Sequence, residues 1–197
     1  MHFEKGSLYH IYNQGNNRQK IFFSRENYFF FLRKIETHIL PFADILAWCL
    51  MPNHFHLMVW VKEVSSSSGS ATLSRTPTTT TFQKSIGILL ASYTRAINKQ
   101  NNSTGSLFRA KTKAECLNLV KPVAPAYFNT CSGTIINIEK PEFQYPSVCF
   151  NYIHQNPVKA NLVKLPNEWE FSSARDYEGL REGGIINIEK ARELELI

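Results

Sequence analysis

The sequence predicts an α+β fold of the ferredoxin-like sandwich type, with helices on one face of an antiparallel sheet. Short apolar segments and two long segments of helical periodicity follow one another in the order strand, helix, strand, strand, helix, and a further strand is expected after them. The chain has 197 residues, of which 43% are hydrophobic, enough for one well-packed core. We therefore expect a single domain over residues 1–197.

The first two predicted elements are a strand over residues 8–13 and a helix over residues 25–39. The polar segment Gly15-Asn16-Asn17 between them is typical of a turn. Ser24 can cap the helix, since its hydroxyl can accept a hydrogen bond from the first free backbone N–H groups. Pro41 ends the helix.

A hairpin follows, with strands over residues 43–50 and 54–61 on either side of a tight Met51-Pro52-Asn53 turn. The next segment is rich in serine and threonine and has too few apolar residues to fold alone, so we expect a flexible insertion over residues 63–82. Residues 82–99 then have the spacing of an amphipathic helix.

The second half of the chain is less regular. After a turn around residues 105–113, residues 114–145 show no clear periodicity, and we expect an irregular insertion there. A helix is predicted over residues 146–156, because Pro146 suits a first helical turn and Pro157 disfavours helical dihedrals at Asn156.

Two histidines in the second strand of the hairpin indicate a metal site. His54 and His56 are two residues apart, so both imidazoles lie on one face of the sheet while Phe55 faces the other. Imidazole is a common ligand of divalent metals. A pair of histidines at a solvent-facing strand edge is the alternative, and a metal site needs a further ligand from elsewhere in the chain.

The last predicted helix supplies a candidate. Tyr152 and Asn156 are four residues apart, so a phenol and an amide oxygen lie on the same helical face. A tyrosine in an apolar helix is also commonly a core residue with its hydroxyl at the surface. The two motifs are far apart in the sequence, and periodicity alone leaves open whether they meet.

Charge and cysteine content narrow the class of protein. The net charge of +6 favours a polyanionic partner such as nucleic acid. The 4 cysteines are scattered without a Cys-x-x-Cys pair, which argues against a zinc knuckle or a disulfide framework and favours reduced thiols in the cytoplasm. The chain has no signal segment and no apolar run long enough to cross a bilayer, so we expect no membrane partner.

These motifs resemble a known family. The His54-Phe55-His56 segment resembles the His-hydrophobe-His (HUH) motif of single-strand-specific tyrosine transposases and rolling-circle nucleases, and Tyr152-x-x-x-Asn156 is similar to their catalytic helix. Residues 152–160 most resemble the REP-associated tyrosine transposases, whose pattern is also seen in residues 9–18, 105–109 and 169–174. The similarity covers most of the chain in the expected order.

The resemblance implies a transposase or endonuclease that cleaves and rejoins single-stranded DNA with hairpins or palindromic repeats, through a 5′-phosphotyrosine. Tyr152 would be the nucleophile, and His54, His56 and Asn156 would bind Mg²⁺ or Mn²⁺, with zinc as an alternative. His154 is a candidate proton acceptor. The implied location is the cytoplasm, in association with the nucleoid.

Residues of the turn after the first strand and of the 105–113 segment would contact DNA: Asn13, Asn16, Asn17, Arg18, Arg109, Lys111 and Lys113. Gln14 departs from the family pattern, which usually has arginine there. Three alternatives stay open: a hairpin-binding protein with little or no catalysis, a general metal-binding or dimerisation module, and a homodimer that exchanges active-site residues between chains.

Overall fold

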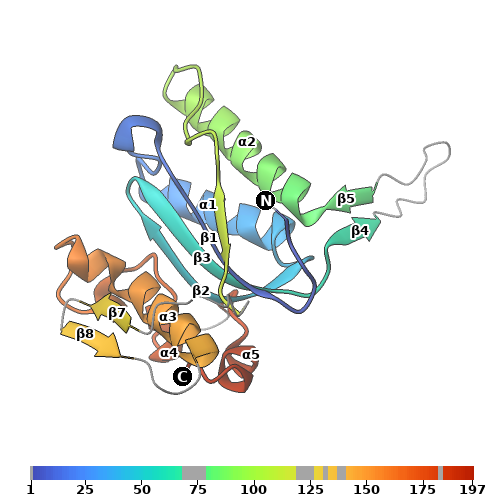
Figure 1. Ribbon diagram of the computed structural model, residues 1–197. Coiled ribbons are helices and arrows are strands. Elements are labelled where there is room, and N and C mark those ends of the chain that lie inside the picture. The colour runs from blue at the N-terminus through green and yellow to red at the C-terminus, as the bar shows by residue number, and fades with distance from the viewer. Residues whose placement is uncertain (1, 68–78, 119–126, 131–132, 137–140, 182–183) are drawn as a thin grey trace.

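The computed structural model describes residues 2–67, 79–118, 127–130, 133–136, 141–181 and 184–197 (Figure 1). Its main sheet is antiparallel, with the strand order β2-β3-β1-β6. The strands are β1 (Leu8–Gln14), β2 (Ala43–Met51), β3 (His54–Val61) and β6 (Lys113–Cys116). The helices α1 (Arg25–His38) and α2 (Phe82–Gln100) connect them in the ferredoxin-like order, which confirms the predicted fold class.

Helices cover both faces of this sheet, not one face as predicted. Helices α1 and α2 pack on one face, while α3 (Pro141–Lys159) and the short α5 (Ile188–Glu193) pack on the other (Figure 1). The cause lies in β2, where eight of the nine residues are buried, so that both of its faces are apolar and need cover. The 3₁₀ helices η1 (Asn16–Arg18) and η2 (Pro166–Glu168) and the short α4 (Ala174–Tyr177) complete the described helices.

The core between the sheet and the first two helices is aromatic. The ring of Phe55 lies 5.2 Å from that of Phe31 in α1, which in turn lies 4.9 Å from the ring of Tyr93 in α2. The buried Tyr93 hydroxyl donates a hydrogen bond to the carbonyl of Ile21 at 2.7 Å. Because Phe55 is anchored in this core, the strand must direct His54 and His56 to the opposite face.

The core on that opposite face orients α3. Phe150 and Ile153 of this helix are buried with Leu46 and Met58 of the sheet, and Ile153 has no exposed surface. Tyr152 precedes Ile153 and is 40% exposed, at the edge of the packed face. Packing of the apolar residues therefore sets the direction in which the tyrosine projects.

Helix α3 is longer than the predicted 146–156, since it begins at residue 141 and ends at Lys159. Pro146 and Pro157 both lie inside it. Pro157 is tolerated because it lies in the last turn, where the missing N–H costs a single helical hydrogen bond. The chain beyond it stays close to the helix, with the Ala160 N–H donating to the carbonyl of Asn156 at 3.0 Å.

The predicted flexible insertion over 63–82 is ordered at its ends. There β4 (Ser65–Ser67) pairs with β5 (Thr79–Thr81), which leads directly into α2. The Thr81 hydroxyl accepts a hydrogen bond from the Lys84 N–H and caps that helix. Threonine favours extended structure, which explains this ladder in a segment of low apolar content. Residues 68–78 lie outside the described residues.

The predicted irregular insertion over 114–145 also contains regular structure. Its first residues belong to β6, which pairs with β1, and β7 (Tyr127–Thr130) pairs with β8 (Gly133–Ile136) as a separate two-stranded ladder. The segment 119–126 and residues 131–132 and 137–140 lie outside the described residues. Strands of four residues give too short a pattern to be found by periodicity.

Within the described ranges, the helices are all too short or too polar to pass through a lipid bilayer.

Candidate active site

Strand β3 places the two histidines on the face that α3 covers. The rings of His54 and His56 lie 5.0 Å apart, His56 is 5% exposed and His54 is partly exposed. His56 pairs with Tyr12 in the β1–β3 ladder, and Phe55 between the histidines belongs to the other core. The predicted alternation of this strand is confirmed.

The His54 ring is oriented by the turn that precedes it. Asn53 donates from Nδ2 to the carbonyl of Arg18 at 3.3 Å, so its Oδ1 faces the ring. The His54 Nδ1 atom lies 2.6 Å from that Oδ1 and must be the donor. His54 therefore has its free lone pair on Nε2.

The Asn156 amide faces that lone pair. Asn156 Nδ2 donates to the backbone carbonyl of Tyr152 at 3.0 Å, which turns Oδ1 toward His54 Nε2 at a distance of 3.4 Å. Neither atom carries a hydrogen in this arrangement, so two acceptors face each other. A cation between them would satisfy both.

His56 offers a second unsatisfied nitrogen. Its Nδ1 lies 2.9 Å from Nε2 of His10, whereas its Nε2 is fully buried and has no hydrogen-bond partner among the described residues. Burial lowers the pKa of His54, and burial together with the neighbouring His10 and His54 holds the pKa of His56 well below its usual range. Both imidazoles are thus neutral at pH 7, the form that binds a metal.

The three candidate donor atoms are two imidazole nitrogens and one amide oxygen, a set that fits a divalent cation which accepts both nitrogen and oxygen ligands. In the part of the chain that the structure describes, no three His, Cys, Asp or Glu side chains converge on a metal position. A shell at this place consequently depends on the amide oxygen of Asn156 beside the two imidazoles. Mg²⁺ and Mn²⁺ accept oxygen ligands and retain several waters, so three protein atoms are sufficient.

Tyr152 joins this cluster from α3. Its ring centroid lies 5.5 Å from that of His56 in an edge-on arrangement, and Nζ of Lys159 lies 5.0 Å from the centre of the tyrosine ring. Tyr152 is 40% exposed, so it is accessible from solvent. The two motifs, distant in the sequence, meet at one place.

His154 has different surroundings. It is 8% exposed, packs against the rings of Phe150 and Tyr177, and its Nε2 lies 2.8 Å from the Ser173 hydroxyl. Burial lowers the pKa of His154 to about 4. These contacts are typical of an interior residue that holds the C-terminal segment, and they leave the proton acceptor of Tyr152 unassigned.

His10 is a neighbour of the site that the sequence reasoning did not single out. It lies in β1, is 6% exposed, and its ring lies beside that of His56 with centroids 5.0 Å apart and 23° between the planes. Burial lowers the pKa of His10 to about 4, against the opposing effect of Glu115. The available signal was a histidine two residues before Tyr12 in the first strand, on the face opposite the buried Ile11.

The predicted DNA-contacting residues divide into two groups. Asn13 is buried and its amide donates to the carbonyl of Arg109 and to the Thr112 hydroxyl, so it holds the segment before β6 in place. Asn16 likewise donates to the Ser106 carbonyl at 2.8 Å. We infer that both amides hold the 105–113 segment in place and do not themselves contact DNA.

Asn17 and Arg18 are exposed at the end of η1, with left-handed φ values of 51° and 58°. The turn is tied to the histidine hairpin, because the Gly15 N–H donates to the carbonyl of Asn53 at 2.9 Å. An added Cβ at Gly15 would lie 2.2 Å from the carbonyl oxygen of Gln19, so the close approach of the Gly15 and Gln19 backbones requires glycine. The exposed side chains of this turn thus lie near the candidate metal site.

A basic groove of about 950 Å³ runs between α2 and the segment before β6. Arg109, Lys111 and Lys113 line it together with Arg95 of α2. The described residues that line the groove include no aspartate or glutamate. The arginine of α2 and the basic residues before β6 therefore share one basic surface.

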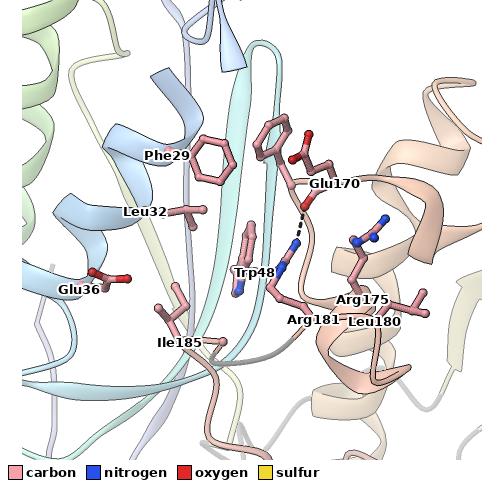
Figure 2. A pocket seen from close by; sticks show the side chains of 11 residues that line it. Phe29, Leu32, Glu36, Trp48, Glu170, Arg175, Leu180, Arg181 and Ile185 are labelled. Atoms are coloured by element: carbon pink, nitrogen blue, oxygen red, sulfur yellow. Dashed lines mark hydrogen bonds between the residues drawn. The ribbon is translucent and has the colours of Figure 1, made fainter. Parts of the chain in front are cut away.

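A smaller cavity of about 260 Å³ lies on the other face of β2, beneath α1 (Figure 2). There Arg181 lies over the ring of Trp48, bonds to Asp176 at 2.8 Å, and donates to the backbone carbonyl of Glu170, as the dashed line in Figure 2 shows. These interactions hold the C-terminal segment against the sheet. The cavity takes no part in the histidine cluster, since Trp48 belongs to the core on the face away from it.

Comparison with known proteins identifies the fold. No family model matches the chain, and no curated protein matches it. A solved structure of a REP-associated tyrosine transposase bound to a REP hairpin is similar over 95% of this chain and 92% of the other, with a TM-score of 0.53 and 17% sequence identity. The chain has the fold of that transposase. The resemblance seen in the motifs is therefore confirmed at the level of the fold.

Proposed function

We propose that the protein is a metal-dependent transposase or endonuclease that binds hairpin-forming single-stranded DNA and cleaves and rejoins it through a 5′-phosphotyrosine intermediate. The main observation in support is the meeting of Tyr152 with two unsatisfied imidazole nitrogens and the Asn156 oxygen. The fold similarity to a transposase bound to a REP hairpin supports the substrate class.

His54, His56 and Asn156 would hold the divalent ion, Mg²⁺ or Mn²⁺. When bound, such an ion polarises a non-bridging phosphate oxygen and reduces the charge repulsion that protects a phosphodiester. The protein fixes the three donor atoms in advance through hydrogen bonds to Asn53, His10 and the Tyr152 carbonyl. Preorganisation of this kind lowers the cost of ordering the site when substrate arrives.

Tyr152 would attack the phosphorus through its phenolic oxygen. The new bond joins the tyrosine oxygen to phosphorus, the bond from phosphorus to the 3′ oxygen breaks, and the phenolic proton passes to solvent. The departing 3′ oxygen takes up a proton and becomes a hydroxyl. Because the phosphotyrosine is itself a phosphodiester, attack by a 3′-hydroxyl reverses the step and rejoins DNA without ATP.

Lys159 is placed to assist this step. Its ammonium group lies over the Tyr152 ring. Lys159 is two helical turns after Tyr152, on the same exposed side of α3. A cation at this distance favours negative charge on the phenol oxygen during attack and can also contact the phosphate. We assign it an electrostatic role.

The basic groove would bind the DNA. Arg95, Arg109 and Lys111 offer positive charge for a phosphate backbone along this groove of about 950 Å³. Lys113 lies opposite Tyr12 in the β1–β6 ladder, on the histidine face, and also lines the groove. It borders both regions and would guide a strand from the groove toward Tyr152.

The test is incubation of the protein with labelled single-stranded hairpin oligonucleotides taken from palindromic repeats, with Mn²⁺ or with a chelator. A denaturing gel should show a protein-linked DNA band that requires Mn²⁺, and mass spectrometry should place the adduct on the peptide with Tyr152. Hairpin binding without an adduct would favour the alternative of a binding protein. An adduct on another residue would refute the assignment of the nucleophile.

A further inference from the structure

We infer that His10 is a positioning residue that accepts a hydrogen bond from His56 Nδ1 and so fixes the ring and the tautomer in which His56 Nε2 is free to bind a metal. The inference rests on the proposed function, because it concerns the same site.

The geometry of the pair is that of a direct hydrogen bond between two buried rings. His10 Nε2 lies 2.9 Å from His56 Nδ1, and the rings are 5.0 Å apart with an angle of 23° between their planes. The two residues are 6% and 5% exposed, so water does not compete freely for these nitrogens. A bond in these surroundings strongly restrains both rings.

The position of the proton follows from the far side of His56. One of the two facing nitrogens must donate, and a neutral imidazole carries one hydrogen. If His10 donated, His56 would carry its proton on Nε2, which has no acceptor among the described residues. If His56 donates from Nδ1, its Nε2 lone pair is free for a cation, and the ring lies beside that of His54, whose own Nε2 faces Asn156 Oδ1.

The sheet holds His10 in turn. Its ring is stacked on that of Tyr12 at 4.7 Å, and the Tyr12 hydroxyl donates to the Glu115 carboxylate at 2.6 Å. Glu115 lies in β6, directly opposite His10 in the ladder. Support for the His56 ring therefore extends across three strands, from β3 through β1 to β6.

A packing role alone does not explain a histidine at this place. A phenylalanine would fill the same volume and stack on Tyr12 without burying two polar nitrogens, whose desolvation is unfavourable. Hydrogen bonds from an outer residue to a metal-binding histidine commonly change metal affinity by about 10–100-fold. This effect distinguishes positioning from packing.

The experiment compares His10→Phe and His10→Gln with the wild type. His10→Phe keeps the stacking on Tyr12 and removes the hydrogen-bond acceptor. His10→Gln places an amide oxygen near the position of His10 Nε2, where it can accept the hydrogen bond from His56 Nδ1. His154→Phe is the matched control, since His154 is another histidine buried on this face, at 8% exposure, and bonded to Ser173. Thermal unfolding verifies that each variant is folded.

Mn²⁺ affinity by titration calorimetry is the first measurement. We expect His10→Phe to weaken binding about 10–100-fold, His10→Gln to recover most of the loss, and His154→Phe to bind as the wild type does. Equal affinity of His10→Phe and wild type would overturn the inference and leave the proposed function standing. An equal loss in His154→Phe would also overturn it, because any buried substitution would then have the same effect.

The second measurement needs no metal. Imidazole ¹⁵N chemical shifts should show the His56 proton on Nδ1 in the wild type and a shift of the population toward Nε2 in His10→Phe. A wild-type protein that binds no Mn²⁺ would refute the metal dependence of the proposed function. The spectra would still show whether His10 fixes the tautomer of His56. An unchanged His56 tautomer in folded His10→Phe would overturn the inference.

Discussion

Replacing Asn156 by leucine should abolish most of the stabilisation that a divalent cation gives this protein while leaving the metal-free fold nearly intact. The amide has two contacts: Nδ2 donates to the Tyr152 carbonyl at 3.0 Å, and Oδ1 faces His54 Nε2 at 3.4 Å. Leucine has a similar volume and loses both. Loss of one such hydrogen bond costs about 1 kcal/mol in the metal-free protein.

The larger effect should be seen with metal. A cation at a concentration of about 100 times its Kd stabilises the folded state by about 2.7 kcal/mol. If loss of the amide oxygen weakens binding by about 100-fold, only about 0.4 kcal/mol remains at the same concentration. For a chain of this size, 1 kcal/mol changes Tm by about 2–4 °C, so the Mn²⁺-induced rise in Tm should shrink by about 5–9 °C.

The assay is thermal unfolding with Mn²⁺ and with chelator, followed by circular dichroism. Asn27→Leu is the matched control, because Asn27 is also a buried asparagine, with its amide bonded to Gln100 and to the start of α1. That variant should lose stability but keep the full Mn²⁺-induced rise in Tm. An Asn156→Leu protein with the same rise as the wild type would show that the amide oxygen is not a ligand.

Three further predictions concern the reaction and the DNA. Tyr152→Phe should abolish the covalent adduct in the oligonucleotide assay, whereas the Tyr12→Phe protein should still form it. Tyr12 is a poor nucleophile, because a hydrogen bond to Glu115 and burial raise its pKa to about 12. An adduct lost only in Tyr12→Phe would reverse the assignment. Lys159→Gln should slow cleavage about tenfold in single-turnover kinetics with little change in hairpin affinity, and an unchanged rate would exclude its electrostatic role. Arg95→Ala should lower by about 0.7 the slope of log affinity against log salt concentration for a single strand, and an unchanged slope would place the DNA outside the groove.

Local periodicity in the sequence was sufficient for several parts of the fold and site. The period of two in a strand puts His54 and His56 on one face and Phe55 on the other, whatever the strand packs against. The period of a helix similarly puts Tyr152 and Asn156 on one side of α3. These relations are confirmed because they depend on backbone geometry within a few residues.

Predictions failed where the deciding interactions are not local. Pro157 was expected to end α3 at Asn156, but the helix continues to Lys159, because Phe150 and Ile153 hold the preceding turns on the sheet and a proline in the last turn removes a single helical hydrogen bond. A further strand was expected after the second helix but without bounds, and residues 114–116 were assigned to an irregular insertion; with Lys113 they form β6, because β1 offers them an unpaired edge. Both outcomes depend on neighbours that are distant in the sequence.

The residue types and their spacing, fixed by the sequence alone, limit the chemistry to two imidazoles, an amide and a phenol on two elements. Only the tertiary structure decided that β3 and α3 meet, that His54 Nε2 faces Asn156 Oδ1, and that His10 bonds to His56. The physical reason is that spacing determines which side of an element a residue occupies, whereas packing of both apolar faces of the sheet determines which elements face each other.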